Sequence, residues 1–411
     1  MMSRLLLTCF LQYSEFVTAN FIAHIMSSNQ LSSRTQSKSR NTLNDSTTKT
    51  TTSKTKKTSS YDANFEQNLI DNGIYPDDYD FPDGRDPSRP NNENVILDRL
   101  GQPRSSLSPS KFSEKAFRTF KQTNSRALHE DDVMSTVFPV IQGGAHISSA
   151  RNMLFNNLKP VTDCNFVDAK PDFYDGARSA QIDRRIRAEL GPYITPSTQL
   201  QAPALANFFT EVKGPDGNVA VAKRQACFNG VVGDRGMRKL AAYEVKNLKT
   251  VYDNNAYTIT STYHSATGSL QMYTVHSTQP ADPETSPEYF MNQLRSFAMT
   301  DTAERFREGA TVFRNARDLT MEQRNEIIAT ANDRITSMSR ESSTLESMLD
   351  TFSQSTNELV APESETSADE LAQDRSEGLS LSRKRRMRRP VKSNPERDSK
   401  KRLKKDCSQM G

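Results

Sequence analysis

The segment Phe208–Gly217, which reads FFTEVKGPDG, constrains the fold of this chain more than any other. Its apolar residues and its Gly/Pro-rich end predict a buried strand that runs into a turn. Side chains alternate along a strand with a rise of about 3.3 Å per residue, so Glu211 and Lys213 share one face roughly 6.6 Å apart. Charged side chains are almost never buried unless they are paired. The alternative interpretation is a charge pair facing water at a sheet edge, which would stabilise the fold by less than about 1 kcal/mol.

Composition limits how much of the chain can form a packed core. Of the 411 residues only 34% are hydrophobic, and the mean hydropathy is -0.73. Much of the chain cannot offset its ordering entropy by burial, so we predict one main domain with long disordered tails. The four cysteines and five histidines show no metal-ligand spacing, which disfavours a zinc site or a disulfide framework.

The formal net charge of +4 conceals a strong asymmetry along the chain. Residues 381–405 hold 13 Lys/Arg and two acidic residues, and residues 1–60 hold eight and two. Residues 61–99 and 341–380 are acidic, with ten acidic residues each. The span 100–340 is close to neutral, with 29 Lys/Arg and 25 acidic residues. Strong attraction to polyanions is therefore predicted for the basic tails rather than for the central domain.

These shifts in composition predict five segments. They are a disordered Ser/Thr/Lys-rich tail (1–60), an acidic arm that docks through aromatic anchors (61–110), the main domain (111–340), an acidic disordered linker (341–380) and a basic tail (381–411). Within the first segment, residues 1–25 are interpreted as an extension upstream of a more ordinary start at Met26. The apolar run of that extension is too short to span a bilayer, so we expect no association with a membrane.

The basic tail contains two clusters of Lys and Arg separated by a short spacer. They are Arg383, Lys384, Arg385, Arg386, Arg388 and Arg389, followed by Lys400, Lys401, Arg402, Lys404 and Lys405. This pattern predicts a bipartite nuclear localisation signal, a nuclear location and a nuclear import receptor as partner. The alternative is a solvated polybasic tail with nonspecific affinity for RNA or membranes. The sequence leaves the oligomeric state open.

Periodicity in the main domain predicts a mixture of strands and helices. Two alternating segments joined by SATG predict a β-hairpin over residues 255–276. Residues 165–172 predict a strand with Pro171 near its end. Helical spacing of apolar residues predicts helices over 147–158, 219–243 and 286–297.

A Pro-Asp at a strand end, a Glu-x-Lys on a later strand and an Ala-rich helix after it resemble the PD-(D/E)XK nuclease superfamily, over roughly residues 147–280. The resemblance implies an α/β (α+β) fold like that of restriction endonucleases, with a central mixed sheet flanked by helices. It also implies a Mg²⁺ site in which Asp172 and Glu211 supply carboxylate oxygens beside the carbonyl of Val212. Lys213 would then orient or deprotonate the attacking water and stabilise the pentavalent phosphate.

The same resemblance suggests further site residues. Asp175 is an alternative to Asp172 as a metal ligand, because the register of the turn after Pro171 is open. Gln225 lies where one branch of the superfamily has a Gln-x-x-x-Tyr element, but the fourth following residue here is Asn229. Glu130 is the nearest acidic residue that could be assigned to the first helix. Residues expected to contact nucleic-acid phosphates are Gln225, Lys223, Arg224 and Arg235.

Longer blocks of the chain look like a large family of fungal proteins defined by a domain of unknown function. These blocks include NLKP at 157–160, DAKPDFYDG at 168–176, FFTEVKGPDG at 208–217, RQA at 224–226 and DNNAYTITSTY at 253–263. That family has no established activity, so the resemblance does not choose between functions. Two remain as alternatives: a nuclear, Mg²⁺-dependent nuclease acting on DNA or RNA, and a noncatalytic module that binds protein or nucleic acid.

Overall fold

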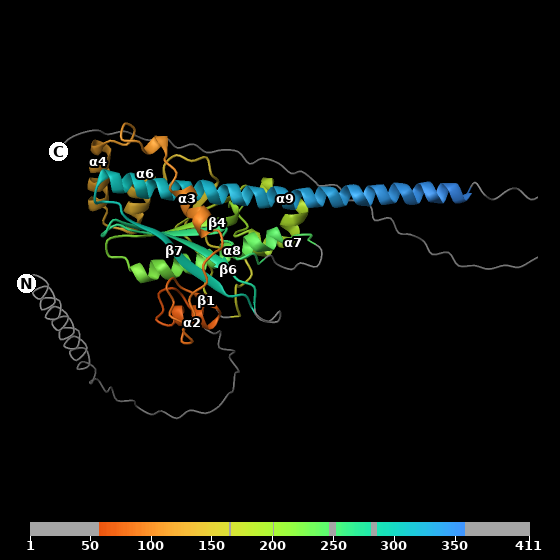
Figure 1. Ribbon diagram of the computed structural model, residues 1–411, viewed down its shortest axis with the longest axis horizontal. Helices are drawn as coiled ribbons and strands as arrows, with labels where there is room; N and C mark the ends of the chain where they lie inside the picture. The colour runs from red at the N-terminus through yellow and green to blue at the C-terminus, as the bar shows by residue number, and fades with distance from the viewer. Residues whose placement is uncertain (1–56, 164–165, 200, 246–251, 281–285, 358–411) are drawn as a thin grey trace, which may run out of the picture. The chain divides into compact units, whose positions relative to one another are not determined.

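The computed structural model describes residues 57–357 except 164–165, 200, 246–251 and 281–285 (Figure 1). The chain divides into two compact units, Met1–Met338 and Ser339–Gly411. The sheet and the candidate site belong to the first unit. The predicted nuclear localisation signal, the basic tail and residues 1–56 of the predicted N-terminal tail lie outside the described residues.

A seven-stranded mixed sheet forms the centre of the first unit, in the order β1-β7-β6-β5-β4-β3-β2. Its strands are β1 (Ile74–Tyr75), β2 (Ser149–Arg151), β3 (Phe173–Ala177), β4 (Ala204–Lys213), β5 (Thr258–His264), β6 (Ser269–Ser277) and β7 (Tyr289–Ala298). The pairs β4–β5 and β1–β7 are parallel, and the other neighbours are antiparallel. The predicted fold class, a central mixed sheet flanked by helices, is confirmed.

Strand β4 is an inner strand of the sheet, and all ten of its residues are buried. It pairs with β3 on one side and with β5 on the other. Because parallel neighbours cannot be joined by a tight hairpin, a crossover element is needed between β4 and β5. The helix α8 (Val219–Ala241) supplies it, capped at its start by the Asn218 side chain. The buried strand, the turn and the helix predicted from the sequence are all present.

Helices cover both faces of the sheet, with α9 along one face and α8 along the other (Figure 1). Among the described residues, the α-helices other than α8 are α2 (Phe65–Asp71), α3 (Glu93–Leu100), α4 (Glu114–Arg126), α5 (Glu130–Asp132), α6 (Phe138–Gln142), α7 (Arg184–Ile194) and α9 (Ala303–Asn357). A π-helical turn over Val133–Val137 joins α5 to α6, and 3₁₀ turns cover Ser105–Leu107 and Ser179–Gln181.

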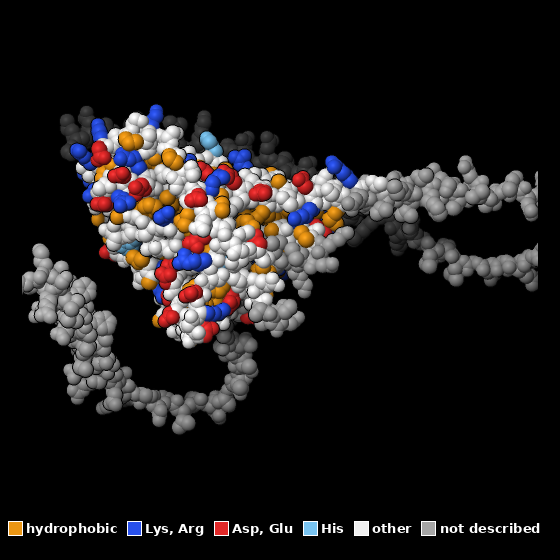
Figure 2. Space-filling model, in the orientation of Figure 1, with side chains coloured by type: hydrophobic (Ala, Val, Ile, Leu, Met, Phe, Trp, Pro, Cys, Tyr) orange, Lys and Arg blue, Asp and Glu red, His pale blue; other side chains and the backbone are white. Residues whose placement is uncertain are grey.

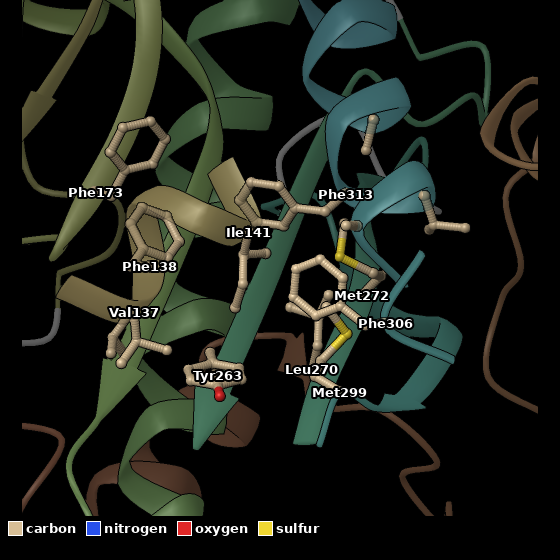
Figure 3. Close-up of a cluster of buried hydrophobic side chains, with 14 of the residues drawn as sticks. Val137, Phe138, Ile141, Phe173, Tyr263, Leu270, Met272, Met299, Phe306 and Phe313 are labelled. Carbon is tan, nitrogen blue, oxygen red and sulfur yellow. The ribbon is translucent and has the colours of Figure 1, made fainter. Parts of the chain in front are cut away.

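From Phe208 onward, alternate residues of β4 contribute to two apolar clusters on opposite faces of the sheet. Phe208 and Val212 belong to the cluster beneath α9, part of which is shown in Figure 3, whereas Phe209 belongs to the cluster beneath α8. On the α9 side the rings of Phe208 and Phe313 meet edge to face at 5.2 Å. Side chains at successive positions of a strand point to opposite faces of the sheet. The same alternation therefore determines which charged side chains of β3 and β4 lie on a common face.

Residues before position 111 contribute directly to this unit. Strand β1 adds to the edge of the sheet by pairing with Tyr289 and Phe290 of β7. Phe65 and Leu69 of α2 are buried in the cluster beneath α8, whereas Leu100 of α3 is buried in the cluster beneath α9. The sheet and both clusters therefore include side chains from the segment predicted to be an acidic docking arm.

Several element predictions were wrong. Residues 147–158 contain the short strand β2 instead of a helix, and residues 286–297 form most of β7. In β7 three consecutive apolar residues, Tyr289 to Met291, are buried, so sheet pairing outweighed the helical spacing of Phe290, Leu294 and Phe297. The strand predicted at 165–172 begins at Phe173 instead. The hairpin at 255–276 is confirmed as β5–β6.

Two segment boundaries also differ from the prediction. Residues 57–60 were assigned to the disordered tail, yet Thr58 forms a bridge with Phe166 and Ser60 is buried. The helix α9 continues to Asn357 and so includes residues that were assigned to the disordered linker.

A buried ion pair links β3 to α9. Arg317 donates from Nε and Nη2 to the two carboxylate oxygens of Asp175 at 2.7 and 2.9 Å, and both side chains are almost fully buried. We predict that Arg317→Met lowers the free energy of unfolding by about 3–5 kcal/mol, because it leaves an uncompensated buried carboxylate. Urea denaturation followed by circular dichroism measures this change.

Two further variants make that prediction specific. Arg305→Ala removes an exposed pair with Glu308 and should change stability by no more than about 0.5 kcal/mol. The double variant Asp175→Leu/Arg317→Met should regain most of the lost stability, since a well-packed apolar pair can replace a buried ion pair. Equal losses in the single and double variants would contradict the proposed origin of the effect.

Candidate functional site

The register between β3 and β4 brings the two predicted motifs together. Phe173 lies opposite Thr210 and Tyr174 opposite Phe209, so continuation of this register places Asp172 opposite Glu211. Residues directly opposite each other in an antiparallel pair project to the same face of the sheet. The backbone N–H of Val212 donates to Asp172 Oδ2 at 2.8 Å and fixes this carboxylate against β4. Asp172 and Glu211 therefore meet on the face covered by α8.

The ammonium group of Lys213 lies among these carboxylates. Its Nζ is 3.4 Å from Asp172 Oδ2 and 3.9 Å from Glu211 Oε2. It also donates to the carbonyl oxygen of Val212 at 2.9 Å. Burial lowers the pKa of Lys213, but the neighbouring carboxylates outweigh burial, so the pKa lies above its ordinary value. Lys213 is therefore a buried cation that neutralises part of the negative charge of the site.

Glu211 is the most deeply buried carboxylate of the site, with 0% of its surface exposed. Asn229 Nδ2 donates to its Oε1 atom at 2.7 Å, whereas Oε2 is buried without a hydrogen-bond partner. Burial and then the nearby Asp172 raise the pKa of Glu211 well above its ordinary value. An unsatisfied buried carboxylate oxygen costs free energy unless a donor or a cation approaches it.

Glu130, at the start of α5, adds a third carboxylate. Its Oε2 atom accepts a hydrogen bond from Lys213 Nζ at 3.2 Å. The backbone of Glu130 can approach because residue 214 is glycine: a Cβ atom there would lie 2.8 Å from the Glu130 nitrogen. Burial, followed by repulsion from Asp172, raises the pKa of Glu130. The acidic residue that the sequence suggested for this role thus lies at the site.

These side chains line one cavity of about 400 Å³ on the α8 face of the sheet. Two residues of α8, Gln225 and Asn229, form part of its wall, and the Gln225 Oε1 atom is buried without a hydrogen-bond partner. The charged residues of the lining are Glu130, Asp168, Asp172, Glu211, Lys170 and Lys213. With four acidic residues and two lysines, the cavity favours a cation over a free anion.

The donor set is compatible with Mg²⁺. This ion is commonly held by one or two carboxylates and retains several waters, and Asp172, Glu211 and the carbonyl of Val212 are oxygen donors of that kind. Gln225 Oε1, which accepts no hydrogen bond, is a further oxygen donor in the cavity. Among the described residues no group of three or more His, Cys, Asp or Glu side chains is arranged to hold a metal ion. A cation would thus depend on waters and on displacement of the Lys213 ammonium from the Val212 carbonyl.

The alternative ligand, Asp175, lies on the opposite face. It is paired with Phe208 in the β3–β4 register and binds Arg317 of α9. Because Asp175 is three positions from Asp172 along an extended chain, the two side chains project to opposite sides of the sheet. The structure therefore favours Asp172 over Asp175 as a partner of Glu211.

Three of the four residues predicted to contact phosphates lie away from the cavity. Lys223 donates to the carboxylate of Asp77 at 3.1 Å, and Arg224 lines the same surface hollow as Lys223. Arg235 donates to the backbone carbonyls of Lys159 and Pro160. Helix geometry explains this result, because residues two positions apart on α8, such as Lys223 and Gln225, face different directions. Only Gln225 of the predicted set lines the cavity.

Asn229 is a site residue that the sequence pattern marked only as a departure from a motif. It lies four residues after Gln225 on α8, and positions i and i+4 share one helix face. The four-residue spacing was the signal in the sequence that could have identified Asn229, because residues 225 and 229 lie on the same face of the helix. The amide of Asn229 can donate to a carboxylate, which gives this position a role with Glu211.

No protein-family model, curated protein or solved structure matches this chain. Among the helices that the structure describes, none combines the length and the apolar character needed to cross a membrane.

The raised pKa of Glu211 makes stability depend on pH. A group with a raised pKa in the folded state stabilises that state fully below its unfolded pKa, near 4.5 here, and this contribution is lost as the pH rises through the folded value. In EDTA we therefore predict that the free energy of unfolding falls as the pH rises above about 4.5, and that Glu211→Gln reduces this fall. Urea denaturation across the pH series measures both slopes.

The variant Glu130→Gln shows how much of the pH dependence comes from the neighbouring carboxylate of Glu130. Glu130 is only partly buried, so Glu130→Gln should alter the slope less than Glu211→Gln does. Identical pH profiles for the wild-type protein and Glu211→Gln would show that Glu211 has no raised pKa.

Proposed function

We propose that this domain is a Mg²⁺-dependent nuclease of the PD-(D/E)XK type that cleaves phosphodiester bonds in nucleic acid. The observation that supports it is the convergence of Asp172, Glu211 and Lys213 in one cavity, from the ends of two adjacent strands. A Pro-Asp and a Glu-x-Lys more than thirty residues apart in the sequence thus meet in space with the residue types that this chemistry requires.

Each residue has a role that follows from its position. Asp172 and Glu211 would hold the cation, and Asn229 orients Glu211 through its 2.7 Å hydrogen bond. Bound Mg²⁺ would neutralise charge on the phosphate oxygens and lower the pKa of a water. Lys213, released from the Val212 carbonyl, would contact the attacking water or the phosphate. Because the lining is acidic, a cation must bind if a phosphate is to enter.

A nuclear location is part of the proposed function. The basic clusters between residues 383 and 405 support import into the nucleus through an import receptor, and the resemblance to a fungal family supports a fungal origin. In the nucleus, DNA and RNA are both available substrates.

A second function, a noncatalytic module that binds protein or nucleic acid, is favoured by a different observation. Lys213 already neutralises Asp172 and Glu130 and donates to the Val212 carbonyl, so the described site is partly balanced by its own residues. Lys223, Arg224 and Arg235 also do not surround the cavity. A nuclease-like domain that had lost catalysis would show these same features.

A cleavage assay on the full chain separates the two functions. We predict that labelled DNA or RNA is cleaved in Mg²⁺ or Mn²⁺ but not in EDTA. Glu211→Ala and Asp172→Ala should abolish cleavage, and Lys213→Ala should reduce kcat by about 10²–10³-fold. Calorimetric titration with Mn²⁺ should show weaker binding for Glu211→Gln than for the wild-type protein.

Exposed residues of α9 provide the controls. Glu308→Ala and Arg305→Ala change one acid and one base outside the cavity and should leave cleavage unchanged. No cleavage by the folded wild-type protein, or equal cleavage by Glu211→Ala, would exclude catalysis at this site and favour the noncatalytic module.

A further inference from the structure

The mouth of the cavity differs in character from its floor. Two of the large apolar side chains exposed on the described surface, Tyr61 at 70% and Leu154 at 44%, line this cavity. The groups that would perform the chemistry are buried, with Glu211 at 0% and Asp172 at 7% exposed. A ligand that reaches these carboxylates must therefore enter the cavity, whose lining includes an exposed aromatic ring.

Tyr61 is held at this position from both sides along the chain. On its N-terminal side Lys57 pairs with Asp168 at 3.1 Å, and the carbonyl of Thr58 accepts from the N–H of Val167 at 2.9 Å. On its C-terminal side Phe65 packs edge to face against Phe166 and Phe228, with centroids 5.2 and 6.1 Å away. The backbone around Tyr61 is thus attached to the segment that forms the cavity wall, while its ring remains free for contact.

An exposed ring beside a site for phosphodiester chemistry is suited to stacking on a base. Aromatic side chains stack on unpaired bases regardless of sequence, because every base has a π-face. In a duplex the bases are already stacked on one another and cannot take such a ring without being unpaired. Tyr61 therefore favours nucleotides that are unpaired at the moment of binding.

The size of the cavity leads to the same conclusion. About 400 Å³ lies within the range of small-molecule pockets, which suits a nucleotide unit rather than a double helix. A duplex would also need an array of Lys and Arg along its phosphates. On the face shown in Figure 2, acidic and basic side chains are interspersed and form no continuous basic area. At the cavity itself, Lys170 is the exposed lysine of the lining.

We propose that the cavity takes an unpaired nucleotide of a single-stranded nucleic acid, with its base stacked on Tyr61 and its phosphate at a divalent cation that Asp172 and Glu211 would hold. This inference rests on the proposed function, since it assigns the substrate class of the same site. Intact duplex would be a poor substrate, because its phosphates could reach the buried carboxylates only after the strand is unpaired.

A fluorescence experiment on the full chain tests the stacking contact independently of cleavage. The probes are single-stranded DNA and RNA oligonucleotides carrying 2-aminopurine, titrated in Ca²⁺ to suppress turnover. We expect the 2-aminopurine fluorescence to be quenched on binding. The affinity of Tyr61→Ala should be roughly 5- to 150-fold weaker, because the stacking energy of one base corresponds to a change of that size. Tyr61→Phe should bind within about threefold of wild type, because the ring is retained.

A cleavage experiment in Mg²⁺ tests the preference for unpaired strands. The substrates are the same oligonucleotides, the corresponding blunt duplex, and a relaxed covalently closed duplex circle. We expect single strands to be cleaved at least tenfold faster than either duplex, and Tyr61→Ala to lower this rate. Leu128→Ala, which removes another exposed apolar side chain outside the cavity, should change neither binding nor cleavage.

The outcomes separate this inference from the proposed function. Cleavage of the closed duplex as fast as of single strands, or equal quenching with Tyr61→Ala, would overturn the unpaired-nucleotide assignment while leaving a nuclease. Quenching that depends on Tyr61 without cleavage of any substrate would support the assignment and reject catalysis. Neither quenching nor cleavage would overturn both.

Discussion

The complete burial of β4 is the constraint on which this structure depends. An inner strand covered by α8 on one face and α9 on the other leaves Glu211 and Lys213 without bulk water, so their charges must be balanced by the protein. Asp172 and Glu130 provide that balance for the ammonium, and Asn229 provides a hydrogen bond for Glu211. The polar cluster is therefore specified by the same pairing that builds the sheet.

The alternation of β3 and β4 sorts buried charges into two separate networks. On the α9 side Asp175 and Arg317 form a closed bidentate pair, with both carboxylate oxygens satisfied. On the α8 side the Oε2 atom of Glu211 accepts no hydrogen bond and lies 3.9 Å from the Lys213 ammonium, beside a cavity. A buried carboxylate whose two oxygens both accept hydrogen bonds has a structural role, whereas a buried oxygen that accepts none beside a cavity is a candidate contact for a ligand. Local hydrogen bonding thus distinguishes two acids that lie on neighbouring strands.

The sequence predicted those parts of the site that depend on local pattern. The apolar run around Glu211, the Gly/Pro turn and the following helix are all local signals, and they were sufficient to locate β4 and α8. The choice between Asp172 and Asp175 required the strand register, which only pairing with β4 determines. The positions of Tyr61 and of β1 depend on contacts between segments more than 100 residues apart, so no local window contains the information.

Because the segment that carries Tyr61 lies before residue 111, the domain from residue 111 onward does not contain the whole site. A chain shortened to begin at residue 111 would keep every charged residue of the cavity lining but would lack Tyr61, Phe65 and β1. Removal of Phe65 would uncover Phe166 and Phe228, and the edge of β7 would lose its partner. The boundary suggested by composition therefore does not delimit a unit that could be moved between proteins. Recombination at that point would transfer the carboxylates without the wall that shapes their cavity.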